Sequence, residues 1–140
     1  MVIDMKKFKL NLTSINDQEK SIFCGEANVS QEGDKFTCTY IDNRDKDNAV
    51  SVKLILDVNE AYIYQTRRSG VNTMYFRKNH TYHGKYYFHD SYFDLRIETL
   101  EYYRKGLATF IKYKSYLNGE YNGTFEHRFE FKEKGECCEC

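Results

Sequence analysis

The sequence predicts an all-β protein: a single antiparallel β-barrel of about 8–10 strands, joined mostly as a meander. The clearest observation is an alternation of large apolar and polar residues from Leu107 to Lys132, interrupted at Asn118-Gly119. That dipeptide favours a two-residue type I′ turn, so the two segments predict a hairpin with one buried face. Elsewhere, alternating segments follow one another at short spacing, and no helical periodicity persists.

The first half of the chain predicts five strands, separated by turns that are rich in Asn, Asp and Gly. These strands span residues 6–14, 21–29, 35–40, 50–58 and 61–68. In the first four, apolar or small residues share one phase: Phe8, Leu10 and Leu12; Phe23, Gly25, Ala27 and Val29; Phe36, Cys38 and Tyr40; Val50, Val52, Leu54, Leu56 and Val58. Period-two alternation places such residues on one face of each strand.

The second half predicts five more strands of the same kind. They span residues 72–78, 81–88, 92–101, 107–117 and 120–132. In the first three, the residues that share one phase are Met74 and Phe76; Tyr82, Gly84, Tyr86 and Phe88; and Phe93, Leu95 and Ile97. The alternation breaks before the last hairpin, so residues 102–106 are expected to form a short helical turn or a loop.

Composition and charge place the chain among single-domain globular proteins. Its 140 residues suffice for one barrel domain, assigned to residues 1–134, before a Cys-rich tail at 135–140 that is expected to be disordered. The 21 basic and 21 acidic residues balance, which argues against nucleic acid or a membrane surface as a partner. No long apolar run and no secretory signal is visible, and the cysteine count, five, is odd. These features predict a cytoplasmic protein with free thiols.

Several segments of the second half are similar, as an ordered set, to those of a known family. They are Thr66–Gly70, Met74–Phe76, His80 with the aromatic strand after it, Phe93–Thr99 and the hairpin Tyr113–Gly119. In these segments the chain resembles the YwiB-like family of small bacterial proteins. The resemblance implies a calycin-type, lipocalin-like β-barrel. That family has no established activity, so the resemblance implies no catalytic residues.

The interior of such a barrel is the first candidate site. A barrel of this size is filled by side chains or holds one small ligand. The inward phase contains residues that could offer polar groups or space to a ligand: Tyr86, Tyr113, Tyr121, His127, Gly84 and Gly123. We therefore expect a non-enzymatic barrel that binds a small apolar or amphipathic ligand. In the alternative, the 13 Tyr and 10 Phe side chains simply fill the interior, and His127 is a hydrogen-bonded core residue.

A second candidate site is a basic surface patch. Arg67 and Arg68 lie on one predicted strand, and Arg77 with Lys78 lies on the next, so the four side chains are expected to face each other in one region. Like charges at that distance cost stability unless acidic partners or an anion offset them. With exposed tyrosines, this patch predicts the alternative function, a protein-interaction or structural module without a ligand.

No catalytic, metal or cofactor site is expected. The sequence has no Gly-x-Ser-x-Gly turn and no glycine-rich phosphate loop. His80, His83 and His89 are close in sequence, but the last two are roughly 20 Å apart along a strand. The three tail cysteines lack the second pair of ligands that a structural zinc site needs. The chain is therefore expected to be neither an enzyme nor a metalloprotein.

Overall fold

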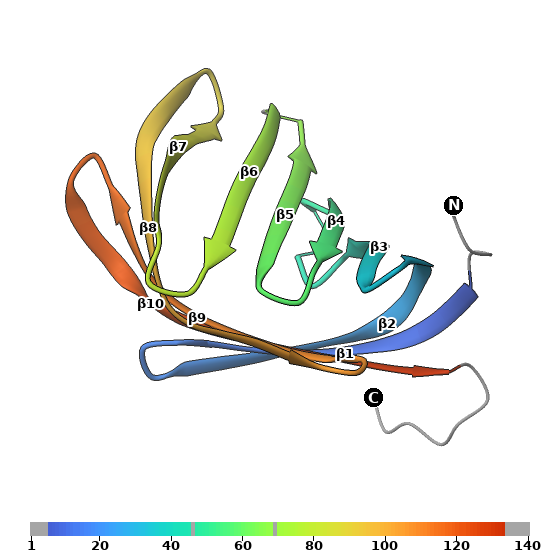
Figure 1. Ribbon diagram of the computed structural model, residues 1–140. Helices are drawn as coiled ribbons and strands as arrows, with labels where there is room; N and C mark the ends of the chain where they lie inside the picture. Colours follow the sequence, from blue (N-terminus) through green and yellow to red (C-terminus); the bar gives the residue numbers. More distant parts are fainter. Residues whose placement is uncertain (1–5, 46, 69, 134–140) are drawn as a thin grey trace.

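The computed structural model describes residues 6–45, 47–68 and 70–133, and over these the chain forms ten β-strands and no helix (Figure 1). The strands are β1 (Lys6–Asn16), β2 (Glu19–Glu32), β3 (Lys35–Asp42), β4 (Val50–Leu56), β5 (Glu60–Arg67), β6 (Gly70–Arg77), β7 (Thr81–Phe88), β8 (Ser91–Lys105), β9 (Ala108–Leu117) and β10 (Glu120–Glu133). The predicted tail at 135–140 lies outside the described residues, so its boundary and disorder remain predictions.

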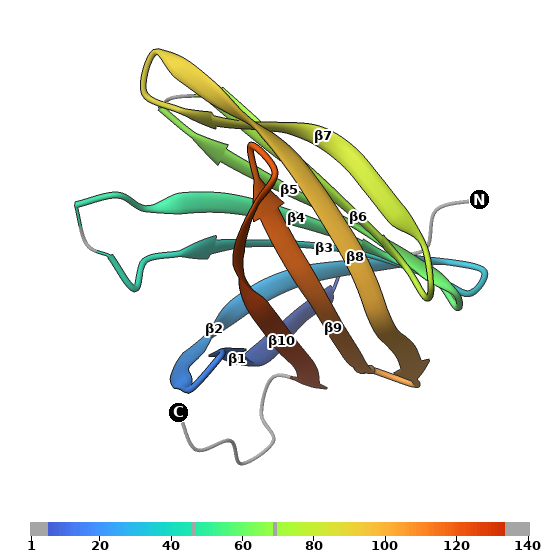
Figure 2. The same ribbon diagram turned by 90° about the vertical axis from the view of Figure 1, so that its left-hand side faces the viewer.

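All ten strands belong to one antiparallel sheet that curls into a nearly closed barrel (Figure 1, Figure 2). Their order is β6-β5-β4-β3-β2-β1-β10-β9-β8-β7. Consecutive strands are therefore neighbours throughout except at β6 and β7, and the first and last strands pair along their length. This arrangement confirms the all-β class, the strand number and the meander order, while the calycin-type assignment remains a prediction.

β6 and β7 flank a seam in the barrel, and one buried side chain bridges it. Asn72 in β6 is 0% exposed. Its Nδ2 donates to the carbonyl oxygen of Tyr87 in β7 at 3.3 Å, and its Oδ1 accepts from the Tyr87 backbone N–H at 2.7 Å. A side-chain amide offers the same donor and acceptor as a peptide group. The Asn72 side chain therefore supplies one pair of hydrogen bonds between β6 and β7, which are not joined by a backbone ladder.

Side chains from β8 close one end of the barrel. The Tyr102 hydroxyl donates to the carbonyl oxygen of Asp57 at 2.5 Å. The Arg104 guanidinium donates to the carbonyl oxygens of Leu56, at 2.9 Å, and Asp34. The core lies inside the barrel, and its fully buried apolar side chains include Leu10, Leu54, Leu56, Phe76, Ile97, Ile111 and Phe129. The opposite end, which carries the β5–β6 and β9–β10 turns, is open and contains a pocket.

The register of β8 shifts between Thr99 and Glu101, where the sequence alternation breaks. After this bulge Tyr102 is buried and the strand continues to Lys105. The expectation of a helical turn or loop at 102–106 is therefore wrong for residues 102–105. A bulge adds one residue to one strand, which inverts the faces of all residues after it. A second shift of this kind lies between Tyr121 and Gly123 in β10.

The structure also describes the helix content and two of the cysteines. Among the described residues there is no helix with the length and apolar character that a membrane crossing requires. Of the two cysteines that the structure describes, Cys38 is a buried free thiol and Cys24 is disulfide-bonded. The expectation of free thiols is therefore wrong for Cys24.

Candidate functional site

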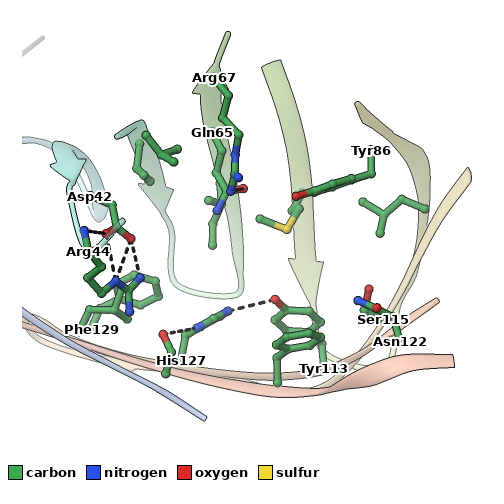
Figure 3. A pocket seen from close by; sticks show the side chains of 18 of the residues that line it. Asp42, Arg44, Gln65, Arg67, Tyr86, Tyr113, Ser115, Asn122, His127 and Phe129 are labelled. Carbon is green, nitrogen blue, oxygen red and sulfur yellow. Dashed lines mark hydrogen bonds and ion pairs between the residues drawn. The ribbon is translucent and has the colours of Figure 1, made fainter. Parts of the chain in front are cut away.

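A pocket of about 430 Å³ lies inside the barrel towards its open end (Figure 3). This volume falls within the range of roughly 300–1,000 Å³ that is usual for small-molecule sites. Much of its wall is apolar, with side chains that include Leu12, Val52, Ile63, Met74, Leu95 and Leu117. The aromatic residues of the chain therefore do not fill the interior, contrary to the alternative that the sequence left open.

His127 lies in the pocket wall and joins three neighbouring strands. Its Nδ1 is 3.0 Å from the hydroxyl oxygen of Ser14 in β1, and its Nε2 is 3.0 Å from that of Tyr113 in β9 (Figure 3). A neutral imidazole donates from one nitrogen and accepts at the other, so both hydroxyls are satisfied in either tautomer. His127 is thus both a hydrogen-bonded structural residue and part of the pocket wall.

Burial keeps this hydrogen-bonded group uncharged. It lowers the pKa of His127 from 6.5 to about 4, and the positive charge of Arg44 acts in the same direction. Burial also raises the pKa of the Tyr113 hydroxyl far above its usual value. At neutral pH the imidazole and the phenol are therefore both neutral hydrogen-bonding groups.

Asp42 and Arg44 form an ion pair at the side of the pocket. The Arg44 Nε donates to Oδ1 of Asp42 at 3.0 Å, and Nη2 donates to Oδ2 at 2.5 Å. Burial alone would raise the pKa of Asp42, but the hydrogen bonds and charge of Arg44, with the charge of Arg67, lower it overall. Arg44 also donates to the Ser21 hydroxyl at 2.9 Å, which holds the β3–β4 loop against β2. The charges of Asp42 and Arg44 offset each other.

Arg67 is a second arginine of the pocket, and it has a different environment. Its side chain runs from the end of β5 into the pocket beside Gln65 (Figure 3). Nη2 donates to Oε1 of Gln65 at a long 3.4 Å. The Nε atom is buried and has no hydrogen-bond partner among the residues that the structure describes. Among the described residues, no carboxylate forms an ion pair with Arg67.

The structure brings three of the predicted interior residues together and moves two away. Tyr86, Tyr113 and His127 line the pocket, as expected from their phase. Tyr121 does not, because it precedes the bulge and therefore faces outward, and Gly123 is buried directly after the bulge without lining the pocket. Tyr121 is 55% exposed, and its hydroxyl lies 3.2 Å from Oδ1 of Asp17, to which it donates. The expectation that Tyr121 stands on the interior wall is therefore wrong.

The two glycines do not open space for a ligand. Gly123 is buried at the bulge with a φ of 145°, and a Cβ atom there would lie 2.7 Å from Oδ1 of Asn16. A Cβ atom on Gly84 would lie 2.5 Å from the hydroxyl oxygen of Tyr82. Each glycine permits a close approach of another side chain, which is the opposite of the role that we expected.

The predicted basic surface patch does not form. In the β5–β6 hairpin, Arg67 pairs with Gly70 next to the turn, and Arg77 pairs with Glu60 at the far end. The Arg77 guanidinium lies 3.6 Å from the carboxylate of that Glu60. Arg67 enters the pocket, and Arg68 is exposed in the turn. The strands of a hairpin run in opposite directions, so Arg77 lies opposite Glu60, which is seven residues from Arg67 along β5. The two arginines are therefore at opposite ends of the hairpin.

Six polar residues of the pocket that were not predicted from the sequence are Ser14, Asp42, Arg44, Gln65, Ser115 and Asn122. A signal for Gln65 was present, because it shares the phase of Ala61 and Ile63, as Arg67 does. Asn122 enters the pocket only because of the β10 bulge, for which the sequence carried no clear signal. Among the described residues, no group of three His, Cys, Asp or Glu side chains could hold a metal ion.

Comparison with known proteins identifies a relative in structure. No known family model and no curated protein sequence matches the chain. A solved structure, that of the ywiB protein from Bacillus subtilis, matches 92% of this chain and 94% of its own, with a TM-score of 0.68 and 12% sequence identity. The two proteins share a fold. The resemblance of the second half of the chain to the YwiB-like family is thereby confirmed at the level of the fold.

Proposed function

We propose that this protein binds a small, partly apolar molecule inside its barrel and does not act as an enzyme. The observation that carries the proposal is the pocket of about 430 Å³, with an apolar wall and a few polar groups that converge on it. One end of the barrel is closed by Tyr102 and Arg104, so the ligand would enter between the hairpin turns at the other end. Location in the cytoplasm remains a prediction.

The chemistry of the pocket favours binding over catalysis. Ser14 and His127 are hydrogen-bonded, as a nucleophile and its base would be. A general base works best when its pKa is near the operating pH, and the pKa of His127 is lowered to about 4. The other ring nitrogen bonds to the Tyr113 hydroxyl, and among the described residues no carboxylate orients the ring. This pair therefore supports a structural role.

The alternative function, an interaction module with a Tyr/Arg patch, loses its main support. Arg67, Arg68 and Arg77 do not share a surface, since they occupy the pocket, the turn and the far end of the hairpin. Capture of a stoichiometric partner in a pull-down experiment would favour this alternative.

Titration with N-phenylnaphthylamine, a neutral apolar fluorophore, tests the proposal. We expect saturable binding to the wild-type protein. The Leu117→Trp change places a large ring in the pocket at the end of β9 and should weaken binding by about tenfold or more. Tyr116→Trp, on the outer face of the same strand, is the matched control and should leave binding unchanged.

Native mass spectrometry of freshly purified protein provides a second measurement, in which a retained small molecule would add a discrete mass. Fluorophore binding that is absent from the wild type, or equal in both Trp variants, would contradict a ligand site in the barrel. Circular dichroism of each variant confirms that the fold is intact.

A further inference from the structure

We propose that Arg67 makes the pocket selective for amphipathic anions, binding the anionic head group while the apolar part of the ligand lies in the barrel. This inference rests on the proposed function, because it names the class of ligand that the same pocket would take.

The first support is the unsatisfied hydrogen-bonding capacity of Arg67. A buried donor without a partner costs free energy, and natural structures seldom leave one. The Nε atom of Arg67 is such a donor, and the bond from Nη2 to Gln65 is long at 3.4 Å. The guanidinium presents donors in a planar fork that matches a carboxylate or sulfate group. An anion in the pocket would therefore meet a donor that the described part of the chain leaves without a partner.

The second support is the charge balance of the pocket. Its charged lining residues are Asp42, Arg44 and Arg67, and Asp42 is ionised at neutral pH because its pKa is lowered. The ion pair of Asp42 and Arg44 neutralises one positive charge. His127 stays neutral. The pocket therefore carries a net charge of one positive unit, centred on Arg67, which favours an anionic head over a neutral or cationic one.

The third support is the position of this charge relative to the apolar wall. Arg67 ends β5, next to the turn at the open end of the barrel. Ile63, four residues earlier on the same face, and Met74 beside it in β6 lie deeper and are apolar. The hydroxyl of Tyr86 also faces this space (Figure 3). A ligand with one anionic head and one apolar chain fits this arrangement, with the head at Arg67 near the open end and the chain against the apolar wall deeper in the pocket.

Three probes that share one chain and differ in the head group test the selectivity. They are decanoate, decanol and decyltrimethylammonium. Isothermal calorimetry is carried out below the micellar concentrations of the two ionic probes and below the solubility limit of decanol. We expect wild-type protein to bind decanoate about tenfold more tightly than decanol, the ratio that a charge-assisted hydrogen bond gives. Decyltrimethylammonium should bind more weakly than decanol, because the net charge of the pocket repels it.

Variants of Arg67 locate the source of the selectivity. Arg67→Met keeps an unbranched apolar stem and removes the charge, so it should bind decanoate no more tightly than decanol. Its affinity for decanol should be retained, which also verifies that the pocket is intact. Arg67→Lys keeps the charge without the planar fork and should give an intermediate preference. Arg68→Met, in the exposed turn beside it, removes an equal charge outside the pocket and should keep the full wild-type preference.

The outcomes separate this inference from the proposed function. Equal affinity of wild-type protein for decanoate and decanol would overturn the role of Arg67 and leave the apolar pocket standing. The same holds if Arg68→Met abolishes the preference as fully as Arg67→Met, because the effect would then be general electrostatics. Failure of all three probes to bind, together with failure of the neutral fluorophore, would overturn both.

Discussion

His127 shows how one side chain can link several strands. It lies in β10, and its two ring nitrogens meet the hydroxyls of Ser14 in β1 and Tyr113 in β9 at 3.0 Å each. Because all three groups are neutral in the pocket wall, no charge has to be buried. Protonation of the ring would turn the accepting nitrogen into a donor and place an unpaired charge there. The stability of the protein should therefore respond to pH through this residue.

The His127→Gln variant tests this pH dependence. The unfolded chain binds the proton with a pKa near 6.5, whereas the folded chain binds it near 4. Between these values the unfolded state binds more protons than the folded state, so the free energy of unfolding falls as the pH falls. The total loss across this range is on the order of 3 kcal/mol. Between pH 7 and pH 5, the free energy of unfolding of the wild type should fall by about 2 kcal/mol more than that of the variant, whose residue 127 does not titrate. Urea unfolding at each pH measures this difference.

The matched control for this measurement is His83→Gln, which changes an exposed histidine on β7. Its stability should follow the wild-type pH profile. Parallel profiles for wild type and His127→Gln would mean that the buried imidazole does not resist protonation as its environment implies.

Single residues also show where sequence alternation is informative. Tyr113 and His127 were predicted to face the interior and do so, because no bulge separates them from the buried residues of their strands. Tyr121 faces outward, against the prediction, because Asn122, three residues after Gly119, is inserted in the ladder as a bulge. The φ of 145° at Gly123 fits this bulge, but a glycine in a strand predicts only that some irregularity is present, not which residues change face.

At the scale of elements, the hairpins were predictable and the seam was not. Asn118 and Gly119 have φ values of 51° and 83°, as a type I′ turn requires, and β9 and β10 pair around them. A turn of this type depends only on adjacent residues, so it can be predicted from the sequence. Asn72 and Tyr87 join β6 and β7, which follow each other in the chain but do not pair in the sheet. Only the curvature of the whole sheet decides that β6 and β7 separate.

The Asn72→Ala variant tests the seam. It removes both hydrogen bonds to Tyr87 and leaves that residue's backbone N–H and carbonyl unpaired, which should cost about 2–3 kcal/mol of unfolding free energy. Hydrogen exchange of the Tyr87 amide should accelerate before global unfolding. Thr73→Ala, on the adjacent outward position of β6, is the control and should change stability by less than about 1 kcal/mol. An equal loss in both variants would show that Asn72 has no special role.

At the scale of the whole molecule, the sheet joins the first and last strands of the chain. β1 and β10 pair from Asn16 with Phe125 to Phe8 with Glu133, so the two ends of the barrel domain are neighbours. The meander order was predictable because short turns make consecutive strands pair. The closure of β1 on β10 was only implied by the expected barrel. The pocket volume could not be predicted, because it depends on how closely all ten described strands curl.

This arrangement makes a circular permutant a test of the fold. Joining Glu133 to Lys6 by a short Gly/Ser linker and opening the chain between Lys78 and Asn79 keeps every described ladder and opens the β6–β7 turn. The linear chain of residues 6–133 is the matched reference, because the permutant also lacks residues 1–5 and 134–140. The permutant should unfold cooperatively, with β-rich circular dichroism. If the curled sheet and Asn72 hold the seam, Asn72→Ala should cost the same in both chains to within about 0.5 kcal/mol. If the turn alone holds the seam, the seam opens in the permutant and the substitution costs nothing there, as urea unfolding would reveal.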